Sequence, residues 1–372
     1  MDAPAEDPKA YTPGALDHGE EFWRDHCEWL HKSGYKLRPR YQPDWKPSWE
    51  ATKKEWFMCE DGIAPRHFKT LDARRVSDGK RVMLKRYDKS IHPHEADIAQ
   101  FLSSEQLLSD PGNHCVPIYE VLQVPDSAEE LILVMPELRD YGNPEFETLG
   151  ELVEFFRQIF EGVQFMHKHH VAHRDISTLN VMMDASSLFL DEYHPYKLQR
   201  KLDLSGPARY STRTQTPVKY YLTDFGLSRK YDPEAGPPRE IPIRGGDKTV
   251  PEFQKPLDPC DPFPTDVYYV GNLIRQNFTE GYKFASPVLG LDFMKPLIAD
   301  MVQDDPSKRP TMDEVVKRFD GIRASLSSWT LRSRVARQND SPLVIPFLLL
   351  THWRRRLTYI VKRVPALPSP PK

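Results

Sequence analysis

The sequence predicts an α+β fold in which a small, strand-rich lobe is followed by a larger, helical lobe. In the first lobe, residues 80–85 have the character of a strand after the turn signal Asp78-Gly79, and residues 131–135 form the short apolar run of a buried strand. From residue 149 onward, apolar side chains recur at helical spacing. Strands gathered in one stretch and helices in the next are typical of the α+β class.

The helical pattern is clearest in a few places. The strand-rich lobe contains one helical stretch, at residues 96–108. Beyond it, a stripe over four turns leads to the motif described below, and two further stretches follow at 266–274 and 291–301. The stripe consists of Leu152, Phe156, Ile159, Val163 and Met166.

The segment before the first lobe is unusual in composition. Residues 1–18 are acidic and rich in proline, which predicts a disordered leader without a secretory signal. Trp23, Cys27 and Leu30 have the spacing of one short amphipathic helix. Residues 37–49 alternate prolines with aromatic side chains, so we expect an extended arm packed on the following lobe, with a linker as the alternative.

These patterns divide the chain into four regions. The third region carries an insertion at 185–217, which lacks periodicity, and loops of that length are usually functional or disordered. The regions are a leader, helix and arm at 1–54, the strand-rich lobe at 55–135, the helical lobe at 136–320, and a basic extension at 321–372.

Composition narrows the class of protein. With 39% hydrophobic and 28% charged residues, the chain fits a soluble globular protein, and its net charge of -3 argues against a nucleic-acid binder. The four cysteines are scattered without a C-x-x-C pair, which argues against structural zinc and a disulfide framework and predicts an intracellular, cytoplasmic location. No apolar run approaches the roughly 20 residues of a membrane span.

Residues 173–180, His-Arg-Asp-Ile-Ser-Thr-Leu-Asn, closely match the catalytic-loop pattern H-R-D-L-x-x-x-N, and residues 224–226 follow as Asp-Phe-Gly. Phosphoryl transfer requires metal-held phosphates, a positioned hydroxyl and balancing positive charge. Asp175 is the candidate base for the hydroxyl, while Asn180 and Asp224 offer the oxygen ligands that Mg²⁺ prefers. Lys85 ends a strand as the phosphate-binding lysine of V-A-I-K does.

On these motifs, residues of about 60–320 resemble a eukaryotic protein kinase domain, and the whole chain more weakly resembles the divergent kinase-like proteins of fungi. Val250-Pro251-Glu252 is similar to the A-P-E end of a kinase activation segment. In the family, the residue at Asp266 holds the backbone of the catalytic loop. The arginine at Arg309 pairs with the A-P-E glutamate, here Glu252.

The resemblance implies a two-lobed protein-kinase-like fold with a cleft that binds ATP and Mg²⁺. It places the adenine against the hinge after Met135, where Glu137 and Leu138 would lend backbone groups. It also implies a protein substrate. It does not indicate an oligomeric state.

The chain departs from the family pattern in three places. The G-x-G-x-x-G loop is absent: its glycine positions fall near Ile63, Pro65 and Phe68, and only Gly62 is nearby. Without glycine, side chains hinder the close approach of the backbone to phosphate. In addition, Ser177 stands where Ser/Thr kinases have a lysine, which removes one charge that would balance the γ-phosphate.

The third departure concerns the acidic helix partner of Lys85. Asp97 is the best-aligned residue and is one methylene shorter than the usual glutamate; Glu95 is the alternative, on another face of the same helix. The remaining interpretation is that both acids lie on a solvated face of the helix and neither pairs with Lys85.

Two further features bear on regulation. Arg174 in kinases can clamp a phosphorylated activation loop, but Ser228, Tyr231 and Thr249 are the only hydroxyl residues between the Asp-Phe-Gly motif and Glu252. We therefore expect activation without loop phosphorylation. The basic extension follows an apolar run at 342–350, which suggests weak contact with an anionic membrane, although a helix packed on the core is favoured.

The sequence thus favours a protein kinase that transfers the γ-phosphoryl group of ATP to a protein hydroxyl, of Ser or Thr, with Mg²⁺. A pseudokinase that acts as an interaction scaffold is the alternative, supported by the lost glycines. A small-molecule kinase is a weaker alternative, because the A-P-E-like segment usually shapes a platform for protein substrates.

Overall fold

The computed structural model describes residues 14–254, 258–283 and 285–370 of the chain. The predicted leader therefore falls largely outside the described residues, since only 14–18 are included. The chain forms two compact units. The first, here called the β unit, collects the residues up to Tyr87, Ile132–Glu137 and Phe189–Tyr210. The second, the helical unit, collects Asp88–Leu131, Leu138–Leu188 and the residues from Ser211 onward.

The β unit is built on an antiparallel sheet. Strands β1 (Tyr35–Lys36), β2 (Thr70–Arg75), β3 (Arg81–Asp88), β5 (Glu130–Pro136) and β4 (Glu120–Gln123) follow one another in this order across the sheet, and β5 passes from one unit to the other. Leu71 pairs with Leu84 and Ala73 with Val82, and all four side chains are buried. The turn predicted at Gly79 joins β2 to β3 with a positive φ of 71°, which favours glycine.

The N-terminal arm packs as the sequence predicted. Trp23, Cys27 and Leu30 are buried, although the expected single helix is split at His26 into α1 (His18–Asp25) and α2 (Cys27–Lys32). The proline-rich stretch continues in short 3-10 turns, and within it Arg40 is completely buried. These turns are Pro39–Tyr41, Ser48–Ala51, Trp56–Met58 and Glu60–Gly62.

Residues 37–69 join β1 to β2, the position of the glycine-rich hairpin in kinases, and Gly62 is the sole glycine in that stretch of sequence. Arg38 anchors the segment: its guanidinium lies 3.1 Å from Asp72 on β2 and 3.1 Å from Glu60, and it donates to the carbonyl of Ile63 at 3.0 Å. A long, internally bonded segment thus replaces the short, flexible hairpin.

Part of the predicted insertion, residues 189–210, belongs to the β unit. Glu192 forms an ion pair with Arg74 of β2 at 2.7 Å, and Tyr193 lies under the guanidinium of Arg81 of β3 at 4.7 Å. His194 is completely buried, and burial, with the positive charge of Arg38, lowers its pKa to about 4. The insertion is therefore packed on the sheet.

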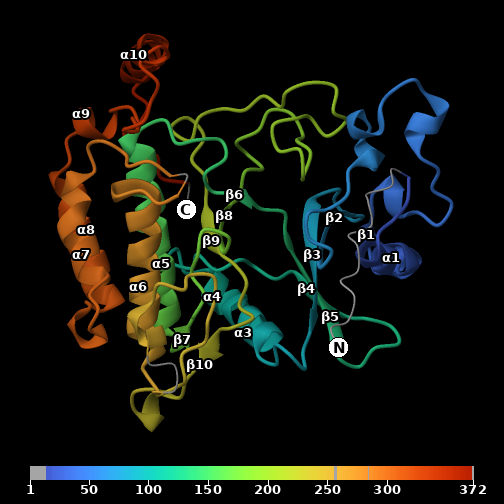
Figure 1. Cartoon of the computed structure of the whole chain (residues 1–372), viewed down its shortest axis with the longest axis horizontal. Helices are drawn as coiled ribbons and strands as arrows, with labels where there is room; N and C mark the ends of the chain where they lie inside the picture. The colour runs from blue at the N-terminus through green and yellow to red at the C-terminus, as the bar shows by residue number, and fades with distance from the viewer. Residues whose placement is uncertain (1–13, 255–257, 284, 371–372) are drawn as a thin grey trace, which may run out of the picture. The chain divides into compact units, whose positions relative to one another are not determined.

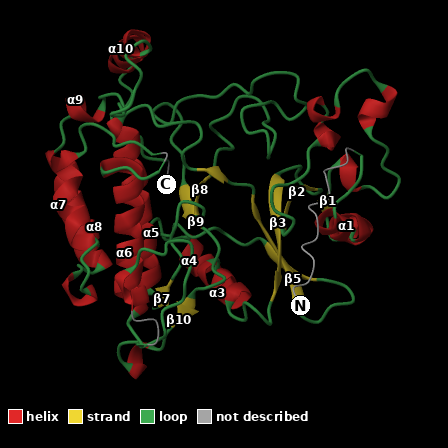
Figure 2. Cartoon of the chain, in the orientation of Figure 1, coloured by secondary structure: helices red, strands yellow, loops and turns green. Residues whose placement is uncertain are grey.

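The helical unit contains the long helices, which lie side by side in Figure 2. Its helices are α3 (Glu95–Leu102), α4 (Glu105–Leu108), α5 (Leu149–Lys168), α6 (Pro262–Ile274), α7 (Lys295–Met301), α8 (Met312–Ser325), α9 (Ser328–Leu331) and α10 (Ile345–Val361). A π-turn at Arg275–Thr279 continues α6. Short ladders join β6 (Arg139–Asp140) to β8 (Val181–Met183) and β9 (Tyr220–Leu222), and β7 (Val171–Ala172) to β10 (Arg229–Lys230).

Helix α5 is the centre of this unit, and all five residues of its predicted stripe are buried. Thr148 caps its first turn by accepting a hydrogen bond from the N–H of Glu151 at 3.2 Å. Gly150 lets the chain approach closely, because a Cβ there would lie 2.1 Å from the carbonyl oxygen of Ala366 in the C-terminal extension.

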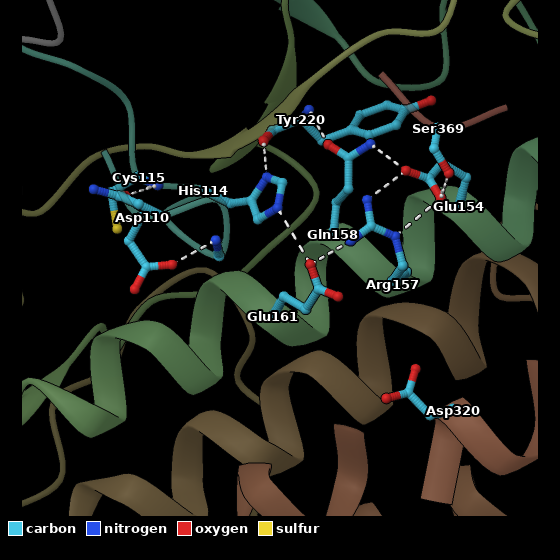
Figure 3. Close-up of polar contacts among 12 residues, drawn as sticks. Asp110, His114, Cys115, Glu154, Arg157, Gln158, Glu161, Tyr220, Asp320 and Ser369 are labelled. Atoms are coloured by element: carbon cyan, nitrogen blue, oxygen red, sulfur yellow. Dashed lines mark hydrogen bonds and ion pairs between the residues drawn. The ribbon is translucent and has the colours of Figure 1, made fainter. Parts of the chain in front are cut away.

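A buried polar network on α5 holds strand β9, which leads to the Asp-Phe-Gly motif (Figure 3). Gln158 accepts from the N–H of Tyr220 at 2.9 Å and donates to Glu154 at 3.0 Å. His114 bonds to the carbonyl of Tyr220 at 3.1 Å and approaches Glu161 at 3.7 Å, and burial lowers its pKa. The backbone of β9 is therefore fixed from both sides by fully desolvated partners.

The basic extension packs against the helical unit, as the favoured interpretation predicted. In Figure 1, α10 lies with α9 at the N-terminal end of α5. Tyr359 bonds to Thr212 at 2.8 Å, and Ser369 reaches Glu154 on α5 at 3.4 Å. Among the described residues, no helix is both long and apolar enough to cross a membrane.

Candidate active site

The catalytic loop, residues 173–180, begins directly after β7 and ends at β8. Its start is fixed by Asp266 on α6, whose carboxylate accepts from the backbone N–H groups of His173 and Arg174, each at 2.7 Å. Asp266 is completely buried, so both charge-assisted bonds are shielded from water. The position that the sequence assigned to Asp266 is confirmed.

Asp175 lies in the loop with both carboxylate oxygens engaged. Its Oδ2 accepts from Nδ2 of Asn180 at 3.0 Å, and its Oδ1 accepts from the N–H of Gly246 at 2.6 Å. Burial, reinforced by the charge of Asp224, raises the pKa of Asp175. Because an ionised carboxylate offers about four lone-pair sites, the group can still accept a further donor.

Asp224 follows β9 and enters the site with a positive φ of 65°, a conformation that costs energy in a residue with a side chain. The preceding Thr223 ties the two loops together. Its N–H donates to the carbonyl of Asn180 at 2.9 Å, and its carbonyl bonds to Nε2 of His173 at 3.1 Å. The structure therefore brings Asp175, Asn180 and Asp224 together, as the motif spacing predicted.

The segment after Asp-Phe-Gly contacts the catalytic loop through the side chain of Glu240. Its Oε2 lies 2.9 Å from Nη1 of Arg174, whose side chain is only 7% exposed. Next to this pair is a shallow hollow that is open to solvent, whose apolar lining includes Ile241, Ile243 and Phe253. A carboxylate of the chain itself thus occupies the anion position beside Arg174.

The end of this segment is anchored by a buried ion pair. Arg309 contacts Glu252 through two parallel bonds of 2.7 and 2.8 Å, and Thr265 donates to the same carboxylate at 2.8 Å. The pairing predicted from the sequence is confirmed. Bidentate geometry and burial make such a pair costly to break.

Comparison with known proteins shows what part of the chain is similar to. A family model for protein tyrosine and serine/threonine kinases matches residues 71–240. The carbon catabolite-derepressing protein kinase of Candida glabrata is 31% identical over 122 residues, 30% of this chain and 19% of that protein. The human NUAK family SNF1-like kinase 2 is 29% identical over 120 residues, 30% of this chain and 18% of that protein. Residues 71–240 are therefore similar to the protein kinase superfamily.

The match spans less than a fifth of the length of these relatives. The match over residues 71–240 agrees with the predicted α+β kinase fold, whose sheet lies mainly in the β unit and whose long helices lie in the helical unit. Whether this domain catalyses phosphoryl transfer depends on the residues of its site.

The residues of the kinase site fit Mg²⁺ bound together with ATP. Because Asn180 uses its amide N–H₂ group on Asp175, its oxygen is the atom left for a cation. Asp224 supplies a carboxylate beside it. Within the described part of the chain, no group of three His, Cys, Asp or Glu side chains could hold a metal alone. Mg²⁺ accepts such a site, since it commonly combines one or two protein ligands with substrate phosphates.

Helix α3 carries the two acids considered as partners of Lys85. Asp97, the best-aligned one, has an exposed side chain. Glu95, the alternative, is only 1% exposed, and its Oε2 lies 3.2 Å from where a Cβ at Gly226 would be. Residues two apart on a helix point about 200° apart, so only one of the two acids can face inward. Burial favours Glu95, and the pairing of either acid with Lys85 stays a prediction.

The other predicted nucleotide ligands are divided between the two units. Lys85 is on β3 of the β unit, together with Met135 and Glu137, whereas Leu138 begins a stretch of the helical unit. Glu137 forms an ion pair with Arg81, and burial raises the pKa of Glu137 to about 7. The roles of these four residues toward ATP stay predictions.

Sequence reasoning missed three residues of the site. Glu240 gave no signal, because a single acid in a loop matches no motif. Gly245 and Gly246 could have been noticed as a glycine pair in the activation segment. A Cβ at Gly245 would lie 2.1 Å from Oδ1 of Asp175, so glycine is required for this approach.

Proposed function

We propose that this kinase domain is an active enzyme that transfers the γ-phosphoryl group of ATP, with Mg²⁺, to a Ser or Thr hydroxyl of a protein. The observation that carries the proposal is the oriented Asp175. Asn180 and Gly246 hold its carboxylate by hydrogen bonds of 3.0 and 2.6 Å, on a loop fixed by the buried Asp266. A scaffold that only binds partners has no need for such preorganisation.

The residues of the chain have distinct tasks in this reaction. Asp175 would orient the substrate hydroxyl and accept its proton as the bond to phosphorus forms. Asn180 and Asp224 would hold Mg²⁺, which neutralises charge on the ATP phosphates when bound. Lys85 would contact the α- and β-phosphates, and Glu95 is the candidate to pair with it.

A protein is the favoured substrate because of the segment that ends at Glu252. The ion pair with Arg309 fixes this segment, and the hollow lined by Ile241, Ile243 and Phe253 adjoins it. Such a hollow suits an apolar side chain next to the acceptor residue. Small-molecule phosphorylation would not require it.

A pseudokinase remains the second candidate function, favoured by two observations. The glycine hairpin is replaced by residues 37–69, and Ser177 lies beside Gly246 where a lysine charge would be expected. Each change removes a contact to phosphate but leaves the base and the metal ligands in place.

Glu240 supports activity without loop phosphorylation, because its carboxylate fills the anion position beside Arg174. Replacing Glu240 with Gln should lower kcat by up to about fivefold, the effect of losing a partly exposed ion pair. Steady-state assays of protein treated with phosphatase should show unchanged wild-type activity. Stoichiometric phosphorylation of Thr249, with activity lost in Thr249→Ala, would contradict this idea.

The proposed function is tested with the full chain in two assays. Thermal unfolding with ATP, with and without Mg²⁺, reports binding, and transfer of labelled γ-phosphate to itself or to a general protein substrate reports catalysis. We expect Mg²⁺-dependent stabilisation together with label transfer. Stabilisation without label would favour a nucleotide-binding pseudokinase, and neither would favour a nucleotide-free scaffold.

A further inference from the structure

The basic extension borders a cavity that the kinase site does not use. It lies where α10 and the C-terminal residues meet the start of α5, and its space of about 320 Å³ is partly open to solvent. Four of its lining residues can carry positive charge and one is acidic. They are Arg332, His352, Arg355, Arg356 and Glu147.

The basic side chains that line this cavity outnumber the acidic ones. Arg355 forms an ion pair with Glu147, which leaves Arg332 and Arg356 without an acidic partner among the cavity's lining residues. Burial, and then the charges of Arg356, Arg334 and Arg355, lower the pKa of His352. The neighbourhood therefore repels an added proton and would attract an anion.

Two donors in the cavity wall also lack partners. Arg356 is only 5% exposed and is stacked on Trp329 at 3.5 Å; its Nη2 donates to the carbonyl of Trp329, but its buried Nε has no hydrogen-bond partner among the described residues. Arg332 donates from Nη2 to the carbonyl of Val364, while its buried Nη1 finds no partner in the described part of the chain. Buried donors without acceptors are costly, so each is explained by an acceptor that the chain does not supply.

The outer face of α10 indicates where that acceptor comes from. Large apolar side chains on this face, and in the turn just before the helix, point into solvent, which is rare for a packed helix. The exposed fractions are 91% for Leu343, 71% for Phe347, 71% for Leu350, 56% for Leu357 and 81% for Val361. Arg354, Lys362 and Arg363 are exposed with them, and no acidic residue follows Asp340 in the sequence.

We propose that the extension is a membrane-binding element: α10 lies on an anionic phospholipid surface with its apolar stripe inserted, and Arg332 and Arg356 bind the phosphate of a lipid headgroup in the cavity. Guanidinium groups suit phosphate because they offer several donors in one plane. An apolar stripe next to basic side chains is the pattern of helices that lie in a membrane interface. The proposal does not depend on catalysis.

The test uses the full chain and vesicles of phosphatidylcholine, alone or with a few per cent of a phosphatidylinositol bisphosphate. We expect sedimentation with the second kind only. Phe347→Glu should weaken binding at least about tenfold, because burying that side chain is worth roughly 1.5–3 kcal/mol. Arg332→Gln should weaken it comparably. Val76→Glu, at an exposed apolar site of the β unit, and Lys317→Gln, on exposed α8, should bind as wild type.

A second experiment distinguishes binding of a lipid headgroup from binding of a soluble phosphate. Soluble inositol hexakisphosphate should stabilise the wild type against heat and lose this effect in Arg332→Gln, while Phe347→Glu keeps it. Binding of the soluble phosphate without any vesicle binding would overturn the lipid assignment. Vesicle binding that is unchanged in Arg332→Gln would overturn the role of the cavity. Because the side chain of Phe347 is largely in solvent, its variant remains informative even if Arg332→Gln unfolds.

Discussion

Replacing Asp175 with asparagine is expected to lower kcat for phosphoryl transfer by about 10²–10⁴-fold, the range typical of a lost general base. The amide that replaces the carboxylate cannot accept the proton of the substrate hydroxyl. It also carries one acceptor where the carboxylate offers two, so it can keep the bond from Asn180 or the bond from Gly246, but not both. We therefore expect a small loss of stability, about 0.5–1.5 kcal/mol.

The measurement is single-turnover transfer of labelled phosphate at saturating Mg-ATP, with thermal unfolding of the same samples. Thr178→Ala is the matched control, because Thr178 is exposed on the same loop. It should retain the wild-type rate. A rate in Asp175→Asn within threefold of wild type would exclude Asp175 as the base, even if both proteins bind ATP equally.

The sequence predicts those features that depend on a motif within one short stretch. The catalytic loop and the Asp-Phe-Gly motif have fixed internal spacing, so the cluster of Asp175, Asn180 and Asp224 followed from the pattern alone. The anchors Asp266 and Arg309 also lie in short motifs. Asp266 binds the backbone N–H groups of the catalytic loop, and Arg309 binds the side chain of Glu252, which lies in a short motif of its own.

The failures concern contacts between distant segments. Choosing between Asp97 and Glu95 requires the rotation of α3 about its axis, which a short amphipathic pattern does not define. The packing of residues 189–210 on β2 and β3 depends on side chains more than 100 positions away, such as Arg74 with Glu192. The two-residue strand β1 is too short for any periodicity, and it pairs only because the sheet is already present.

Loss of the carboxylate of Glu20 is expected to cost the β unit about 3–5 kcal/mol, the penalty of breaking a buried ion pair. Glu20 and Arg40 are both fully buried and are joined by bonds of 2.6 and 2.8 Å, and Tyr41 donates to the same carboxylate at 3.0 Å. Glu20→Gln would leave the guanidinium of Arg40 buried without its counter-charge. Urea unfolding followed by tryptophan fluorescence measures the change, with Glu21→Gln, an exposed neighbour on α1, as the control.

The pH dependence of this loss identifies its cause. Burial alone would raise the pKa of Glu20, but the hydrogen bonds and charge of Arg40 outweigh it, so the pKa lies below its usual value of 4.5. The stability from the ion pair is therefore present above pH 4.5 and is lost as the pH falls through the lower, folded-state pKa. The difference between wild type and Glu20→Gln should shrink over that acidic range. A difference that stays constant there would mean that Glu20 stabilises the arm by packing rather than by its charge.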